Sequence, residues 1–202
     1  IGFSSGLSST SSTGRLAASE VGEEYPDCKL YAVDSLCASL GQGMLVYLAA
    51  QKKSEGKTIE EVRDWVEANK MSMAHHFTVN DLFFLKRGGR VSAATAVVGS
   101  MLSIKPLLHV DDEGHLINVQ KARGRNAAIT ELFDKMRETA IDPQRQVVYI
   151  SHGDCYDDAK KLADMIEEEF GIKDILISEV GPVIGAHSGP GTLALFFLGK
   201  NR

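Results

Sequence analysis

The chain has 202 residues, of which 44% are hydrophobic and 24% are charged, and its net charge is −5. This composition excludes a disordered chain, and the acidic balance argues against a nucleic-acid-binding protein, which usually carries a basic face. The sequence has no run of 18 apolar residues and no C-x-x-C pair among its three cysteines, so we expect no membrane-spanning segment and a cytoplasmic protein in a reducing compartment.

The first part of the chain, residues 1–72, predicts an α/β domain. Ile1 to Phe3 have the character of the end of a buried strand. The elements expected after it are a helix from Ser9 to Glu24, a strand over 28–35, a helix over 41–56, and a helix that opens on the capping box Thr58–Glu61 and runs to about Asn69. The order β-α-β-α-α is typical of a parallel sheet flanked by helices.

The second part, residues 73–202, predicts a separate α/β domain with a mixed sheet, the boundary falling near residues 70–76. The turn at 111–114 joins two strand-like runs in a probable hairpin. Strands are expected over 76–80, up to about 110, and over 115–122, 146–151, 174–180 and 194–199; helical segments are expected over 81–90, after 91, and over 126–140 and 156–171.

The stretch SSGLSST, residues 4–10, places hydroxyl groups and a glycine directly before a helix. Ser8 or Ser9 could simply cap that helix by accepting from its free N–H groups. The alternative is that a hydroxyl and free amides at the helix N-terminus bind a carboxylate or phosphate. A Walker A loop is excluded because no lysine follows the glycine at the required spacing.

The stretch GPVIGAHSGPG, residues 181–191, contains four glycines and two prolines. Such a composition predicts a fixed, irregular loop. His187 lies in its middle, beside Ser188. Either this histidine is merely exposed or the rigid loop presents it as a positioned hydrogen-bond donor.

Cations gather in the middle of the acidic chain. Between Asp81 and Arg125, seven Lys or Arg less four Asp or Glu leave a local charge of +3. These cations form either a solvated surface or a docking face for an anionic partner. His75 and His76 are neighbours on a predicted strand and should face opposite ways, so no metal site is expected.

In their order, SSGLSST, LKRGGRVS, MLSIKPLL and GPVIGAHSGPG resemble the DegV family of bacterial fatty-acid-binding proteins. The resemblance covers the whole chain. It implies two α/β domains with a long-chain fatty acid bound between them as the ligand, without any cofactor. It also implies a carrier without catalysis of its own, which presents the fatty acid to a fatty acid kinase that makes an acyl-phosphate.

The resemblance also assigns roles to individual residues. Ser8 and His187 match the positions that contact the fatty-acid carboxylate, and Arg90 and Arg123 match basic positions expected to face the kinase. The residues expected to support the carboxylate site are Ser5, Ser9 and Ser188. One departure is that Ser9 stands where the family commonly has glycine.

A second departure is that the family's opening segment, with its TSQPS-like stretch, is missing. We therefore expect this chain to bind fatty acid weakly and to associate more readily than a longer one. The apolar stretches 93–104 and 194–198 could wall the acyl site, although an ordinary core would use them too. The alternative function is a transferase or hydrolase that acts on a small carboxylate or phosphate ester through His187 and Ser8; no acidic partner for His187 is evident in the sequence.

Overall fold

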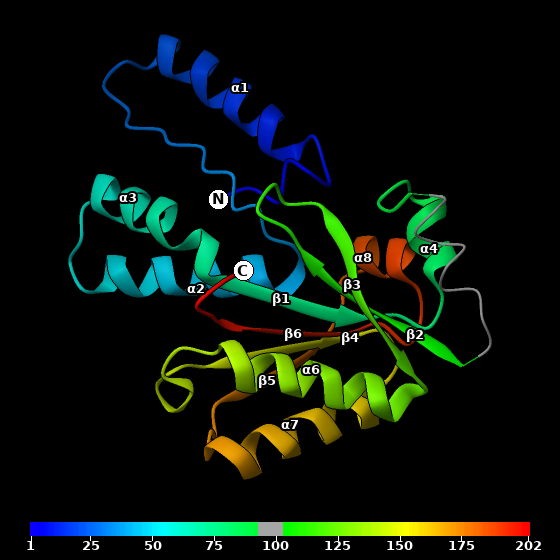
Figure 1. Ribbon diagram of the computed structural model, residues 1–202. Helices are drawn as coiled ribbons and strands as arrows, with labels where there is room; N and C mark the ends of the chain where they lie inside the picture. The colour runs from blue at the N-terminus through cyan, green and yellow to red at the C-terminus, as the bar shows by residue number, and fades with distance from the viewer. Residues whose placement is uncertain (93–102) are drawn as a thin grey trace.

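The computed structural model describes residues 1–92 and 103–202, and its centre is one six-stranded sheet (Figure 1). The strands are β1 Met73–Thr78, β2 Ile104–Val110, β3 Leu116–Arg123, β4 Val148–His152, β5 Ile175–Glu179 and β6 Leu193–Leu198. Their order is β3-β2-β1-β6-β4-β5. Only β4 and β5 run parallel; the other neighbours are antiparallel. The predicted α/β class with a mixed sheet is confirmed.

Helices cover both faces of this sheet. They are α1 Thr10–Glu24, α2 Ser39–Ser54, α3 Ile59–Asn69, α4 Leu82–Arg87, α6 Arg125–Thr139, α7 Tyr156–Phe170 and α8 Pro182–Ser188, with 3-10 turns at Lys70–Ser72 and Pro143–Arg145. In Figure 1, α6 and α7 lie together on one face, while α2 and α3 lie on the other side of the strands. The helix α1 projects away from the sheet.

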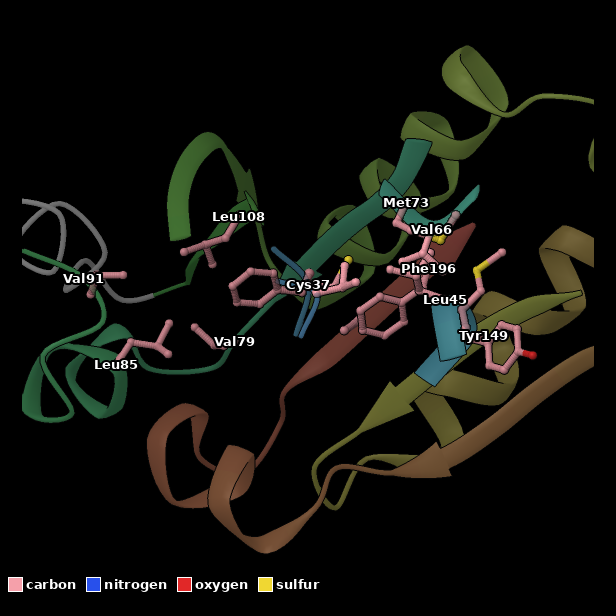
Figure 2. Packing of buried hydrophobic residues seen from close by; sticks show 14 of the residues in the cluster. Cys37, Leu45, Val66, Met73, Val79, Leu85, Val91, Leu108, Tyr149 and Phe196 are labelled. Atoms are coloured by element: carbon pink, nitrogen blue, oxygen red, sulfur yellow. The ribbon is translucent and has the colours of Figure 1, made fainter. Parts of the chain in front are cut away.

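Alternation along β6 divides the core into two layers. Leu193, Leu195 and Phe197 pack with the buried residues of α6 and α7. Ala194 and Phe196 belong to the opposite layer, which includes buried residues of α2 and α3. Figure 2 shows Phe196 in that layer, packed with its neighbours from β1, β4, α2 and α3. Successive strand residues point to opposite faces, so one apolar strand serves both layers.

Elements with a strong local signal match their predictions. The capping box is present, with the Thr58 side chain accepting from the Glu61 N–H and the Glu61 side chain accepting from the Thr58 N–H. The hairpin is formed by β2 and β3 around the turn at 111–114. The small-residue helix expected after residue 91 lies outside the described residues, except at its two edges.

The predicted strand over 28–35 is wrong. This segment is irregular, and only Asp34 forms a bridge, to Gly2. A strand needs a neighbouring backbone to satisfy its N–H and C=O groups. Here the neighbour is the short segment around Gly2, whose N–H donates to the Val33 carbonyl and whose carbonyl accepts from the Ser35 N–H. The pairing ends after this one bridge, so the strand propensity of 28–33 has no ladder to join.

The predicted irregular loop over 181–191 is also wrong in its first part. Pro182 to Ser188 form the short helix α8, with Gly181 as the N-cap. Proline suits the first helical position because its fixed φ is helical and it lacks only an N–H that would have no partner there. The loop character is confined to Gly189–Gly191, where both glycines have positive φ.

The predicted boundary between residues 72 and 73 falls at the first residue of β1. One hydrophobic cluster joins Met44, Leu45 and Val66, which precede it, to Phe77 and Phe196, which follow it. The described chain is therefore organised around a single sheet, and the division into domains 1–72 and 73–202 stays a prediction.

Gly41 in α2 packs directly against a buried side chain. A Cβ at this position would lie 2.0 Å from Nε2 of His75, which is fully buried. The ring cannot move away freely, because its Nδ1 donates to the Met73 carbonyl at 2.6 Å.

We therefore predict that Gly41→Ala lowers the free energy of unfolding by about 1–3 kcal/mol, the usual cost of overpacking a core. Urea unfolding measures this change. Gly14→Ala in α1 is the matched control, because nothing lies within 4 Å of its Cβ position. The control should be neutral or stabilising by about 0.5–1 kcal/mol. Equal effects of the two substitutions would contradict the packing described for α2.

Candidate functional site

A cavity of about 290 Å³ lies over the face of the sheet that carries Phe77, Ala194 and Phe196. Apolar side chains make up most of its wall, and the polar ones come from several separate elements. The lining residues are Phe3, Leu7, Ser8, Thr10, Ala38, Ser39, His75, Phe77, Leu85, Arg90, Val110, Leu116, Ser151, Val180, Val183, Ile184, His187, Ser188, Thr192, Ala194 and Phe196. An apolar cavity with a few convergent polar groups is the usual form of a small-molecule site.

Ser8 lies at the end of a tight turn before α1. The turn is held by Ser4, whose hydroxyl donates to the Gly114 carbonyl at 2.8 Å and whose carbonyl accepts from the Ser8 N–H. The Oγ of Ser8 accepts from the Thr10 N–H at 3.2 Å and lies 2.8 Å from the Thr10 Oγ1. The Ser8 side chain thus accepts from the first N–H of α1 and also lines the cavity, and its contact with a carboxylate stays a prediction.

Glycine is required inside this turn. A Cβ on Gly6 would lie 2.8 Å from the backbone of Glu113 and Gly114, in the turn between β2 and β3. Real Cβ contacts are not that short, so a side chain at this position would push the Ser8 turn off the sheet. The glycine of SSGLSST thus serves close packing, which brings Ser8 over the cavity.

His187 lies in the last turn of α8 and is half-buried. Its ring packs on the glycine pair after α4, because a Cβ on Gly88 would lie 2.1 Å from the His187 Nδ1. Ser188 also lines the cavity, but its hydroxyl donates to the Ile184 carbonyl at 2.9 Å, within the helix. Of His187 and Ser188, only Ser188 therefore has a side-chain hydrogen bond to another described residue.

Arg90 connects these two sides of the cavity. Its Nε and Nη2 donate to the Leu7 carbonyl at 3.1 and 2.9 Å, and its Nη1 donates to the Gly88 carbonyl. One guanidinium therefore ties the turn that carries Ser8 to the backbone on which His187 rests. Arginine suits this role because its five N–H donors lie in a rigid plane.

The remaining predicted site residues lie elsewhere. Ser5 and Ser9 are exposed and do not line the cavity. The Ser5 N–H donates to the Asp34 carboxylate, and Ser9 is the N-cap of α1 without a side-chain cap bond. Arg123 ends β3 and is exposed. The structure thus brings together Ser8, His187, Ser188 and Arg90, and leaves out Ser5, Ser9 and Arg123.

Sequence reasoning missed five polar residues of the cavity wall, namely Thr10, Ser39, His75, Ser151 and Thr192. His75 and Ser151 lie on β1 and β4, where they occupy the same face as the apolar floor. The available signal was the alternation of these strands, which assigns every second residue to one face. As expected, His75 and His76 point apart: His75 packs edge-on against Phe196, and His76 stacks on His109 and Phe197.

Comparison with known families matches residues 1–200 to the family described as "Uncharacterised protein, DegV family". The DegV domain-containing protein CPE0026 of Clostridium perfringens is 49% identical over all 202 residues, which span 69% of that protein. The chain belongs to the DegV family. The resemblance to this family that the four motifs indicated is thereby confirmed.

Solved structures of DegV proteins have the same fold. A fatty-acid-binding DegV family protein from Thermus thermophilus has a TM-score of 0.82 and 32% identity, over 96% of this chain and 68% of its own. The Fatty Acid Kinase B3 protein of Streptococcus pneumoniae, loaded with linoleic acid, has a TM-score of 0.90 over 97% of this chain and 69% of its own. At 22% identity this second likeness shows the fold alone.

Within 1–92 and 103–202, no group of three or more His, Cys, Asp or Glu is arranged to hold a metal ion. No helix in the same ranges is long and apolar enough to cross a membrane.

Two buried histidines make the stability of the fold depend on pH. Burial lowers the pKa of His75 to about 3 and that of His76 to about 4. In the unfolded chain both titrate near the ordinary value of about 6.5. Between the folded and unfolded pKa values, the unfolded state therefore binds more protons than the folded state. The contribution of these histidines to the free energy of unfolding is fully present above about pH 6.5 and falls as the pH is lowered towards 4.

We predict that lowering the pH from 7 to 5 reduces the free energy of unfolding by roughly 2 kcal/mol for each of these histidines. Urea unfolding at the two pH values measures the loss. His76→Leu should remove its own share of this loss, roughly 2 kcal/mol, because the substituted residue no longer takes up a proton on unfolding. An unchanged pH dependence in this variant would show that other groups dominate.

Proposed function

We propose that this DegV chain binds a long-chain fatty acid, with the carboxylate between Ser8 and His187 and the acyl chain over the apolar floor. One observation carries the proposal: these two residues, far apart in the sequence, line the same cavity. The Thermus thermophilus relative, described as fatty-acid-binding, supports the same ligand class.

The chemistry of the wall fits a single carboxylate on a long apolar chain. A hydroxyl and an imidazole at one side offer hydrogen-bond donors, and hydrogen bonds to a charged acceptor contribute about 1.5–3 kcal/mol each. Phe77, Leu85, Ala194 and Phe196 supply apolar surface. Each methylene group that leaves water contributes about 0.8 kcal/mol, so the acyl chain provides most of the affinity.

We infer further that the chain is a cytoplasmic carrier without catalysis, which presents the carboxylate to a fatty acid kinase for acyl-phosphate formation. The DegV resemblance supports this role. The enzyme alternative needs an acidic group that orients His187, and within the described residues no carboxylate is hydrogen-bonded to this ring. No observation favours the alternative, and we do not propose it.

Docking of the kinase by Arg90 and Arg123 stays a prediction. A substitution tests it more cleanly at Arg123 than at Arg90. Arg123 is exposed and away from the cavity, so its charge is free to face a partner. Arg90 holds Leu7 and Gly88, so any substitution there also disturbs the cavity wall. The partner surface is therefore best examined at Arg123.

We predict that Ser8→Ala and His187→Ala each weaken fatty-acid binding about tenfold or more, because each removes a donor to a charged oxygen. Isothermal titration calorimetry with oleate measures the dissociation constant relative to the unsubstituted chain. Ser9→Ala is the matched control, since this neighbouring serine does not line the cavity. If all three variants bind within twofold of the unsubstituted chain, the carboxylate lies elsewhere.

We predict that Arg123→Glu slows acyl-phosphate formation by a fatty acid kinase at least several-fold, because reversed charge opposes docking. The bound fatty acid, measured by mass spectrometry of an organic extract, should stay the same. Raising the salt concentration should bring the rate of acyl-phosphate formation with Arg123→Glu closer to the rate with the unsubstituted chain, because salt screens charges. Equal rates at low salt, or loss of the lipid in this variant, would refute a docking role.

A further inference from the structure

The cavity has a second group of polar side chains that the carboxylate does not use. Ser39, His75 and Ser151, which we call the inner polar cluster, come from the start of α2, from β1 and from β4. His75 is 1% exposed and Ser151 is 0% exposed. Polar groups buried in an apolar wall are costly unless they are hydrogen-bonded, so their bonding partners must be accounted for.

The two serines do not satisfy each other fully. Their Oγ atoms lie 3.2 Å apart, so one hydroxyl donates to the other. Each serine carries one hydroxyl hydrogen. One of the two hydrogens therefore has no acceptor among the described residues. Ser39 does not cap α2 either, because the N-cap is Ala38 and no side-chain cap bond is present.

Both ring nitrogens of His75 contact backbone groups of the core. Its Nδ1 lies 2.6 Å from the Met73 carbonyl, which can only accept, so the ring proton is on Nδ1. The lone pair is then on Nε2, and its contact is the Ala38 N–H at the long distance of 3.4 Å. This edge of the ring also packs against Gly41 of α2, so His75 supports the cluster from the core side, and the serine pair presents the free hydroxyl donor to the cavity.

The register of the sheet places the cluster away from the carboxylate side. Ser151 is paired with Ala194, and His75 with Phe196, along β6. Both positions follow Thr192 in the strand direction, by two and four residues. At about 3.3 Å a residue, Ser151 is level with a point roughly 7 Å from Thr192, which itself follows α8 and His187. A ligand anchored at His187 reaches the cluster with the middle of its chain.

Resting on the proposed function, we propose that the inner polar cluster binds a hydroxyl group in the middle of the acyl chain. The substrate class is then a mid-chain hydroxy fatty acid. A hydroxyl both donates and accepts, so it can accept the spare hydrogen of the serine pair and donate to a free lone pair of the same serine oxygens. A plain methylene chain leaves that spare hydrogen without a partner, and a site built to bind a hydroxyl discriminates against an analogue that lacks it.

Isothermal titration calorimetry with four acids tests this inference: stearate, 2-hydroxystearate, 10-hydroxystearate and 12-hydroxystearate. The quantity compared is the dissociation constant of stearate divided by that of each hydroxy acid. For at least one mid-chain isomer this ratio should be about ten, and for 2-hydroxystearate it should be one or less. A desolvated but unpaired hydroxyl would weaken binding instead.

Two variants and one control locate the effect. Ser151→Ala should lower the ratio for the preferred isomer about tenfold. Ser39→Gly should do the same without strain, because Ser39 has a φ of 51°, which glycine adopts readily. Ser178→Ala is the matched control: Ser178 is paired with Ser151 on the neighbouring strand, is exposed and does not line the cavity. Its ratio should stay unchanged.

The outcomes separate the two levels of the proposal. If stearate binds but every mid-chain hydroxy acid binds more weakly, the inner polar cluster is structural and this inference is wrong. The same holds if neither Ser151→Ala nor Ser39→Gly changes the ratio. If none of the four acids binds, the proposed function itself fails, and the inference fails with it.

Discussion

The antiparallel pairing of β1 with β6 at the centre of the sheet is the interaction on which the rest of the structure depends. It joins a strand from the first half of the chain to the last strand, over six paired residues. Every hydrogen bond of this ladder fixes which residues face each side. One side packs on α6 and α7, and the other becomes the floor of the cavity. The floor is therefore part of the hydrophobic core.

The side of the cavity that carries Ser8 and His187 depends on a smaller set of contacts. Three segments meet there: the turn before α1, the glycine pair after α4 and the end of α8. Arg90 holds the first two through their carbonyl groups, and His187 packs on the second. A single half-buried guanidinium thus joins elements that neither share a strand nor follow each other in the sequence. The two residues proposed to hold the carboxylate depend on this arrangement for their separation.

Much of this organisation could be predicted from the sequence, because its signals are local. The capping box at Thr58 and the hairpin around 111–114 each depend on a few neighbouring residues, and both are present. The segment 28–35 failed because strand formation needs a partner, which local propensity does not report. The prediction of a loop over 181–191 was wrong for Pro182–Ser188, because the four glycines favour an irregular loop while the proline at the start of α8 favours a helix start.

The site shows the same division. Ser8 and His187 were found because they stand in distinctive motifs, and the structure places both in one cavity. Ser39, His75 and Ser151 carry no motif; they reach the cavity through strand register and helix packing, which are set by contacts between distant residues. Arg90 was recognised as basic, but a count of charges cannot show that its guanidinium is used by two carbonyl groups inside the wall.

The most direct test of this account is a crystal structure of the chain with oleate bound. The account predicts one carboxylate oxygen within about 3 Å of the Ser8 Oγ and one within about 3 Å of a His187 ring nitrogen, the ordinary hydrogen-bond distance. The acyl chain should then lie over Phe77, Ala194 and Phe196. A carboxylate at the opposite end of the cavity, or a fatty acid bound along α1 instead, would contradict it.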